Sequence, residues 1–200
     1  MEKQRIAIFA SGSGSNAECL VRHFADSAIA EIAWVGCNRP ATTAGIYARL
    51  KPLGIQVTQF SKAELHDGRL LERLQQARIE WVMLAGFLLQ VPPSIIDAFP
   101  NRMLNVHPSL LPDFGGPGMF GKFVHAAVSE SGKTETGISV HYVTEAYDEG
   151  EIIFQATCSI PAGEDPEKIA AHVQELEHQY IPKVLEHLIR ESVNQVEWRS

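Results

Sequence analysis

Apolar and polar residues follow one another along this chain in a pattern that predicts alternating strands and helices. Short apolar runs predict buried strands at 6–10, 32–37, 55–58 and 81–84, and one more that ends at His107. Between them, helical spacing predicts helices after Asn16, over 43–53, over 65–77, and from the Pro92-Pro93 pair to near Phe99. This order predicts an α/β fold in which a mostly parallel, twisted sheet has right-handed crossovers and helices on both faces.

The pattern changes after His107. Residues 113–121 are rich in glycine, and a helix through Val124 and Val128 follows and ends near Gly132. Residues 136–143 alternate as a strand does, and residues 151–160 are the expected hairpin partner across a loop at 144–150. The last helix is expected to start at Asp165-Pro166, with Pro182 kinking or dividing it.

The chain is expected to form a single domain over 1–200. Within it we expect a Rossmann-like, phosphate-binding half at 1–100, a catalytic half with the hairpin and the long helix at 101–189, and a polar tail or loose strand at 190–200. Ligands of such sheets bind beyond the carboxyl ends of the strands. The loop at 11–16 and His107 both follow strands, so we expect them to face one crevice.

Composition narrows the functional classes. The 200 residues are 45% apolar, as in an ordinary globular protein, and the net charge of -7 argues against a nucleic-acid partner. The longest clearly apolar run, 81–89, is too short to span a bilayer, and the start lacks the apolar stretch of a signal peptide. Three widely spaced cysteines indicate reduced thiols, and so a cytoplasmic protein without a membrane partner.

Asn105-Val-His107 lies where an apolar run meets Pro108. Side chains two apart in a strand share a face, so the amide and the imidazole are expected to point the same way. Pro108 cannot donate to a sheet, so the strand is expected to end at His107. An amide donor beside a titratable ring can stabilise an oxyanion and move a proton, although a strand end whose polar groups are satisfied locally fits the motif as well.

The stretch Ser11-Gly-Ser-Gly-Ser-Asn16 joins a strand to a helix. Its glycines allow close approach of a ligand, and the helix start offers unpaired N–H groups, which together favour a phosphate site. It is not a Walker loop, because no Gly-Lys-Ser/Thr follows. It is not a complete Gly-x-Gly-x-x-Gly either, because Ala17 stands where the third glycine would be. A strand–helix turn with a serine cap is the alternative.

The loop at 144–150 contains Asp148, which can approach His107 if the two strands that carry them are neighbours. A carboxylate there would keep the imidazole protonated. By itself the loop is more typical of a hairpin turn than of a site. His107, His125 and His141 lack the spacing of a metal motif, so no metal is expected.

Six segments in this order resemble the phosphoribosylglycinamide formyltransferases, folate-dependent enzymes of purine synthesis. They lie between Arg5 and about Leu188, and are Ala10-Ser-Gly-Ser-Gly-Ser-Asn16, Leu84-Ala-Gly-Phe87, Asn105-Val-His-Pro-Ser-Leu-Leu-Pro112, Gly137-Ile-Ser-Val-His-Tyr-Val143, Asp148-Glu-Gly150 and Gln174-Glu-Leu-Glu-His178. The resemblance implies transfer of a formyl group from 10-formyltetrahydrofolate, a co-substrate, to the amine of N1-(5-phospho-D-ribosyl)glycinamide in purine (IMP) biosynthesis.

The resemblance also implies residue roles. Catalysis falls to Asn105, His107 and Asp148. The ribonucleotide is expected on Gly14, Ser15, Asn16, Gln174 and Glu177. The folate is expected on Leu88, Leu89, Gln90, Val91, Asn105, Val143 and Asp148, against an apolar wall of Leu84, Ile96 and Met103. The partners are then small molecules only, and the chain is expected to be a monomer or a homodimer.

The chain departs from the family pattern at three positions. Leu89 and Ala63 stand where family members often carry arginines that hold the folate tail, and Phe123 replaces one histidine of a Gly-x-His-x-His motif. Two other functions stay open. One is a related formyl-handling enzyme on the same fold, such as a 10-formyltetrahydrofolate hydrolase, and the other is a catalytically silent phosphate- or folate-binding module.

Overall fold

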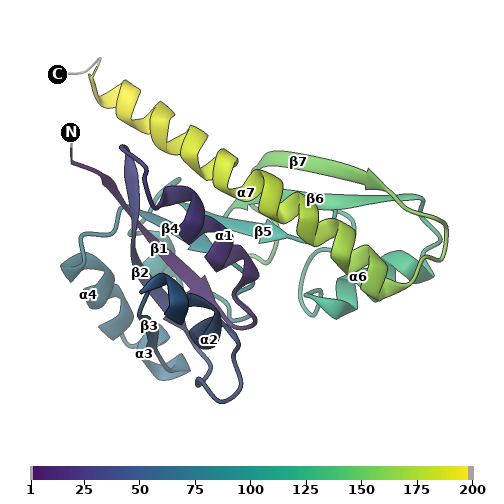
Figure 1. Ribbon diagram of the computed structural model, residues 1–200, viewed down its shortest axis with the longest axis horizontal. Helices are drawn as coiled ribbons and strands as arrows, with labels where there is room; N and C mark the ends of the chain where they lie inside the picture. The colour runs from purple at the N-terminus through teal and green to yellow at the C-terminus, as the bar shows by residue number, and fades with distance from the viewer. Residues whose placement is uncertain (1, 198–200) are drawn as a thin grey trace. The chain divides into compact units, whose positions relative to one another are not determined.

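The computed structural model of the chain describes residues 2–197 and shows two compact units. Unit 1 comprises the residues up to Phe87 together with those from Ile181 onward, and unit 2 comprises Leu88–Tyr180. The elements of both can be followed by label and colour in Figure 1. Seven strands and their helices among the described residues make the fold α/β, as the sequence predicts.

Unit 1 contains a parallel sheet. Its strands are β1 (Gln4–Ala10), β2 (Ala30–Cys37), β3 (Val57–Gln59) and β4 (Trp81–Leu84), in the order β3-β2-β1-β4. All three strand pairs are parallel, which confirms the predicted parallel sheet. Residues 6–10 of β1 have no exposed surface, because β1 is a central strand of apolar residues.

The helices of unit 1 are shorter than predicted. They are α1 (Ser15–Phe24), α2 (Ile46–Leu50), the 3₁₀ turn η1 (Lys51–Leu53), α3 (Lys62–His66) and α4 (Arg69–Gln76). The prediction of one helix over 65–77 is wrong, because Gly68 adopts a φ of 91° between α3 and α4. A capping box of Ser61 and Glu64 starts α3 three residues earlier than we expected a helix there.

Unit 2 contains an antiparallel sheet of β5 (Met103–His107), β6 (Glu135–Tyr142) and β7 (Ile152–Ser159). These three strands lie side by side in Figure 1. The hairpin of β6 and β7 is confirmed, and β6 also pairs with β5, with Asn105 opposite His141 and His107 opposite Ser139. The unit also holds α5 (Pro93–Ile96) and α6 (Lys122–Glu130).

The last helix, α7 (Pro166–Glu197), is longer than predicted. The helix continues through Pro182, so Pro182 does not divide it. Residues 190–197 are helical, so the expected tail or strand is wrong for them. An Arg190–Glu186 ion pair one turn apart, at 2.5 Å, supports this last part of the helix. Residues 198–200 lie outside the described residues.

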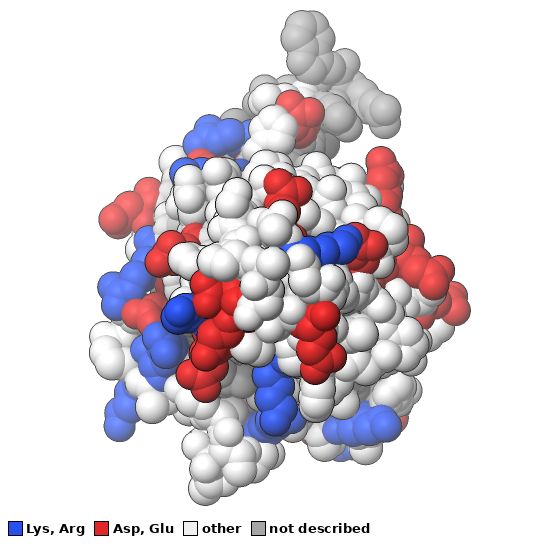
Figure 2. Space-filling view, turned by 90° about the vertical axis from the view of Figure 1, so that its right-hand side faces the viewer, with Lys and Arg blue, Asp and Glu red and all other residues white. Residues whose placement is uncertain are grey.

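Within the described residues, every helix is too short or too polar to cross a bilayer. Acidic and basic side chains are mixed on the face shown in Figure 2. The ion pairs at the surface include Lys168 with Glu164 at 3.1 Å.

Candidate active site

Asn105 and His107 share one face of β5, as their spacing predicts. Asn105 is half-buried and His107 is only 3% exposed. The strand ends at His107, directly before Pro108. A buried imidazole at a strand end needs partners for both ring nitrogens, because an unpaired polar atom is costly there.

Asp148 reaches His107 because β6 neighbours β5, which was the condition set by the sequence. The Oδ2 atom of Asp148 lies 3.4 Å from His107 Nδ1, and the Asp148 side chain is 10% exposed. The backbone of Asp148 adopts a φ of 56°, an uncommon value for a residue other than glycine. Two residues further on, a Cβ on Gly150 would lie 1.7 Å from the Tyr142 carbonyl oxygen, so only glycine fits this return of the loop.

Asp148 is held as a carboxylate. Burial by itself would raise the pKa of this carboxyl, but the neighbouring His107 and His141 rings and the Gly116 N–H hold its pKa far below its usual value. The Gly116 N–H donates to Oδ2 over 2.9 Å. The glycine-rich segment at 113–121 therefore contributes a backbone donor to the cluster.

The second nitrogen of His107 faces the same segment. His107 Nε2 lies 2.8 Å from the carbonyl oxygen of Phe114, so Nε2 carries a proton and donates it. With Asp148 at Nδ1 and a carbonyl at Nε2, both ring nitrogens face acceptors. A ring whose nitrogens both face acceptors is placed to act as a proton donor.

A buried hydrogen-bond network fixes the backbone that follows His107. Ser139 Oγ accepts from the Leu111 N–H over 2.9 Å and donates to the Ser109 carbonyl over 2.7 Å. Gln155 Nε2 donates to the Leu111 carbonyl over 3.0 Å and to Ser139 Oγ over 2.8 Å. Ser109 Oγ in turn donates to the Asp113 carbonyl over 2.7 Å. The strands β6 and β7 thus determine where the segment that contacts His107 begins.

The structure adds a residue that sequence reasoning considered only as a metal ligand. His141 on β6 is 3% exposed, and its Nε2 lies 3.0 Å from Asn105 Nδ2 and 3.6 Å from Asp148 Oδ1. The sequence alone does not single out His141, because its place in the cluster depends on the pairing of residues 141 and 105 across two strands. His125, which was left out of the catalytic set, is buried on α6, and burial lowers the pKa of its imidazole.

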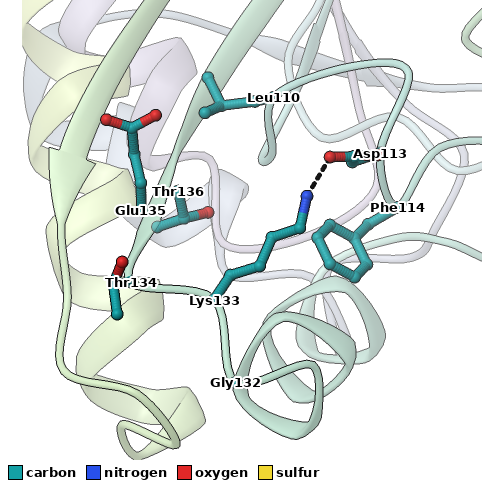
Figure 3. A pocket seen from close by; sticks show the side chains of 8 residues that line it. All are labelled: Leu110, Asp113, Phe114, Gly132, Lys133, Thr134, Glu135 and Thr136. Carbon is teal, nitrogen blue, oxygen red and sulfur yellow. Dashed lines mark hydrogen bonds and ion pairs between the residues drawn. The ribbon is translucent and has the colours of Figure 1, made fainter.

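A cavity of about 390 Å³ is lined by Leu110, Asp113, Phe114, Gly132, Lys133, Thr134, Glu135 and Thr136. Figure 3 shows Lys133 extending across it to Asp113, with which it forms an ion pair. The Lys133 ammonium also lies 5.4 Å from the centre of the Phe114 ring. None of the predicted catalytic residues lines this cavity, so it is distinct from the candidate active site.

The predicted phosphate loop lies in unit 1. Gly14 precedes α1 with a φ of 75°, and a Cβ there would lie 2.5 Å from Ile46 Cγ1, so glycine is required. Ser15 and Asn16 are the first two residues of α1, with Asn16 buried. Arg49, which sequence reasoning missed, donates from Nε to the Ser13 carbonyl over 2.9 Å. The Arg49 guanidinium also pairs with Glu18 over 2.8 Å. The loop therefore has a helix start, whose N–H groups favour an anion, beside an arginine that is paired with an acid of the same helix.

The other predicted binding residues lie mainly in loops and on α7. Gln174 is exposed and Glu177 half-buried on α7. The segment Leu88–Val91 follows β4, and its Gln90 Nε2 donates to the Glu145 carbonyl over 2.8 Å, so two predicted folate segments contact each other within unit 2. Val143 follows β6 and donates from its backbone N–H to Met103 over 2.9 Å. Residues Leu84 and Met103 are buried at strand ends, and Ile96 is half-buried on α5. The common crevice with the loop at 11–16 would involve both units and stays a prediction.

A buried carboxylate–imidazole pair beside a carboxamide, on an α/β fold, defines the class of protein as an enzyme that can donate a proton and stabilise an oxyanion. Comparison with known proteins gives the family. The family model described as "Formyl transferase" matches residues 4–185. The chain belongs to the formyl transferase family and is an enzyme of the formyltransferase class.

Similar proteins share this class. The chloroplastic phosphoribosylglycinamide formyltransferase of Arabidopsis thaliana is 34% identical over 98% of this chain and 68% of its own length. A trifunctional purine biosynthetic protein of Drosophila pseudoobscura is 35% identical over 92% of this chain, which spans 14% of that protein. This chain covers 63% of the length of the chloroplastic phosphoribosylglycinamide formyltransferase of Vigna unguiculata. The chain thus spans about two thirds of the plant proteins and a small part of the trifunctional one.

Solved structures agree with these sequence relatives. A glycinamide ribonucleotide transformylase of Symbiobacterium toebii superposes with a TM-score of 0.85 at 31% identity, covering 94% of this chain and 89% of that one. A phosphoribosylglycinamide formyltransferase of Brucella melitensis has a TM-score of 0.83 at 34% identity, covering 94% and 96%. The predicted fold class and the predicted family are therefore confirmed.

Proposed function

We propose that this chain transfers the formyl group of 10-formyltetrahydrofolate to the amine of N1-(5-phospho-D-ribosyl)glycinamide, a step of purine biosynthesis. The single observation that carries the proposal is the contact of Asp148 with His107, at 3.4 Å, beside Asn105. The names of the relatives from Arabidopsis and Symbiobacterium support the choice of acceptor. The family supports a folate-type formyl donor.

The residues present fit such a donor. 10-formyltetrahydrofolate, when bound, supplies an electrophilic formyl carbon. The substrate amine would attack the formyl carbon, and Asn105 and His107 are the donors that would stabilise the negative charge developing on the formyl oxygen. When that intermediate collapses, the bond from the formyl carbon to the folate nitrogen breaks, and the proton lost by the amine passes to this nitrogen. Because Asp148 holds Nδ1 of His107, the Nε2–H is the donor that can reach the formyl oxygen. It would do so by exchanging its hydrogen bond to the Phe114 carbonyl for one to that oxygen. Each donor of this kind contributes roughly 3 kcal/mol to transition-state stabilisation.

The binding roles belong to the same proposal. We assign the ribonucleotide phosphate to Gly14, Ser15 and Asn16, with Arg49 as an additional cation, and the rest of that substrate to Gln174 and Glu177. The folate is assigned to Leu88–Val91, Val143 and the loop that carries Asp148. Because Leu89 and Ala63 cannot pair with a carboxylate, we expect weak discrimination between folates with one and with several glutamates in the tail. A cytoplasmic location and a monomeric or homodimeric state are part of the proposal.

The test is an assay with the full chain, 10-formyltetrahydrofolate and glycinamide ribonucleotide, with water as the control acceptor. We expect formylated ribonucleotide and negligible hydrolysis. Formate release without transfer would instead identify a hydrolase, and no turnover would identify a silent binding module. Either result would overturn the proposal.

Two variants connect the assay to the site. His107→Ala should abolish transfer without changing the fold, whereas His66→Ala, at an exposed position on α3, should behave as the unmodified chain does. Replacing both Ser15 and Asn16 by alanine should raise KM for the ribonucleotide more than it lowers kcat. Normal turnover of His107→Ala would exclude the catalytic assignment, and an unchanged KM would exclude the phosphate assignment.

A further inference from the structure

Four large hydrophobic side chains are exposed among the described residues, and all four lie in unit 2. Two of them, Phe120 and Phe123, are 41% and 49% exposed and contact each other edge to face, with 5.2 Å between their ring centres. A third, Tyr147, is exposed on the loop that carries Asp148. Exposed apolar side chains that stand together, unlike single ones, indicate an interaction site.

Lys122 lies between the two phenylalanines in the sequence and adds a positive charge to them. It is the first residue of α6, and its ammonium lies 5.5 Å from the centre of the Phe123 ring. The other two lysines of unit 2, Lys133 and Lys168, form ion pairs with acids, whereas Lys122 forms none within residues 2–197. The aromatic patch of Phe120, Lys122 and Phe123 therefore fits an aromatic compound that carries a carboxylate.

The aromatic patch continues the segment that reaches the candidate catalytic residues. The Gly116 N–H donates to Asp148 over 2.9 Å. From there the chain turns, because the Met119 N–H donates to the Gly116 carbonyl over 3.1 Å, and a second turn follows in which the Phe123 N–H donates to the Phe120 carbonyl over 3.2 Å. The ends of such a turn lie within about 7 Å and neighbouring Cα atoms about 3.8 Å apart, so the backbone of Phe120 lies within about 11 Å of that of Gly116.

The proposed formyl donor has the chemistry that the aromatic patch fits. In 10-formyltetrahydrofolate, the nitrogen that carries the formyl group is bonded directly to a benzene ring, and the far side of this ring carries an amide-linked glutamate. When the formyl carbon lies at Asn105 and His107, the ring must therefore lie beside the catalytic residues, with the glutamate carboxylates a few bond lengths further out. The aromatic patch, a short stretch of chain beyond Gly116, lies in this range.

We propose that Phe120, Lys122 and Phe123 bind the aminobenzoyl-glutamate part of the folate donor, with its ring against a phenylalanine and a carboxylate of its first glutamate at the Lys122 ammonium. This inference rests on the proposed function and deepens it, because it assigns the tail of the donor to residues outside the predicted folate set. A single lysine contacts only one glutamate, which agrees with the weak discrimination of tail length expected above. Loss of the aromatic patch should weaken donor binding and leave kcat and ribonucleotide binding unchanged.

The kinetic test compares two replacements of Lys122. Lys122→Gln removes the charge, and we expect KM for 10-formyltetrahydrofolate to rise about fivefold, with kcat and KM for the ribonucleotide within about twofold, because an exposed pair contributes modestly. Lys122→Glu repels the carboxylate, and we expect a larger rise, of about 30-fold. Lys168→Gln, at an exposed lysine of the same unit, is the matched control and should leave KM unchanged. An unchanged KM in both Lys122 variants would overturn the proposal.

A donor without the glutamate, 10-formyltetrahydropteroate, separates a contact with the tail from an effect on the catalytic residues. With this donor, Lys122→Gln should raise KM less than about twofold, because the carboxylate that it would lose is already missing. An equal rise with both donors would overturn the proposal. Replacing Phe120 and Phe123 together by serine should raise KM for both donors, since both retain the benzoyl ring, and an unchanged KM would overturn the ring contact.

A readout independent of turnover is calorimetric binding of tetrahydrofolate and tetrahydropteroate to the full chain. The unmodified chain should bind tetrahydrofolate about fivefold more tightly, and Lys122→Gln should bind the two equally. A preference that persists in Lys122→Gln would overturn the proposal, as would a serine variant that dissociates a dimer and keeps both dissociation constants. A chain that shows the Lys122-dependent preference but transfers no formyl group would refute the proposed function and leave this inference standing.

Discussion

Replacement of Asp148 by asparagine isolates the charge that the cluster depends on. The side chain keeps its size and can still accept from the Gly116 N–H, which donates to the carboxylate over 2.9 Å. What is lost is the negative charge 3.4 Å from His107 Nδ1. Without it, Nδ1 of His107 faces a neutral amide in place of a charged carboxylate.

The separation of the two groups sets the magnitude. Opposite charges 3.4 Å apart interact by about 5 kcal/mol at an effective dielectric constant of about 20. This is an upper value for the catalytic effect, because both groups also lose hydration. A positioned proton donor contributes roughly 10²- to 10⁴-fold to a rate, which is about 3 to 5 kcal/mol. We therefore expect Asp148→Asn to lower kcat by about 10²-fold or more.

The assay measures formyl transfer to glycinamide ribonucleotide at saturating concentrations of both substrates, and KM for each. Asp113→Asn is the matched control, because it removes the same charge from the neighbouring segment, where Asp113 pairs with Lys133. We expect that control to keep kcat within about threefold, since exposed ion pairs contribute little. A kcat for Asp148→Asn within threefold of the unmodified chain, in a folded protein, would refute the reasoning.

The lowered pKa of Asp148 also predicts that the stability of the chain depends on pH. Its pKa in the folded chain is lowered from the ordinary value of 3.8, so its contribution to stability is fully present above that value and is lost as the pH falls below it. The difference in unfolding free energy between the unmodified chain and Asp148→Asn should therefore shrink on acidification. Chemical denaturation at a series of pH values measures it, and a difference that grows as the pH falls would contradict the sign.

Two further predictions concern stability. Gly14→Ala forces a side chain into a φ of 75° and against Ile46, and should lower the unfolding free energy by about 1–3 kcal/mol in chemical denaturation. Gly12→Ala is the control and should cost far less, because no atom lies within 4 Å of its Cβ; equal costs would contradict the steric argument. Ser139→Ala leaves the buried Leu111 N–H without its acceptor and should cost about 1–3 kcal/mol; a change below about 0.5 kcal/mol would show that the network does not hold the segment.

The sequence by itself determined most of the strands and the shared face of Asn105 and His107. Apolar runs such as 6–10 are buried strands because only a central strand covers both of its faces. Pro108 ends β5 at His107, and the period of two in a strand puts Asn105 on the same face. These are local consequences of backbone geometry, which is why they can be predicted without knowing the partners of each strand.

Where the prediction of an element failed, backbone geometry or a surface pair outweighed the spacing of apolar residues. The apolar spacing over 65–77 continues across Gly68, but its positive φ separates two helices. The polar end of the chain at 190–197 has little apolar spacing, yet it extends α7 with support from Arg190 and Glu186. Helix ends depend on such single residues more than on periodicity.

Only the tertiary structure decided which groups meet. The pairing of β5 with β6 brings Asp148 to His107 across 41 positions of sequence, and it places His141 opposite Asn105. The Phe114 carbonyl and the Gly116 N–H join the cluster as backbone groups, which no residue type reveals. Contacts of this kind depend on strand register and loop path, since burial requires every polar group to find a partner wherever the fold brings one.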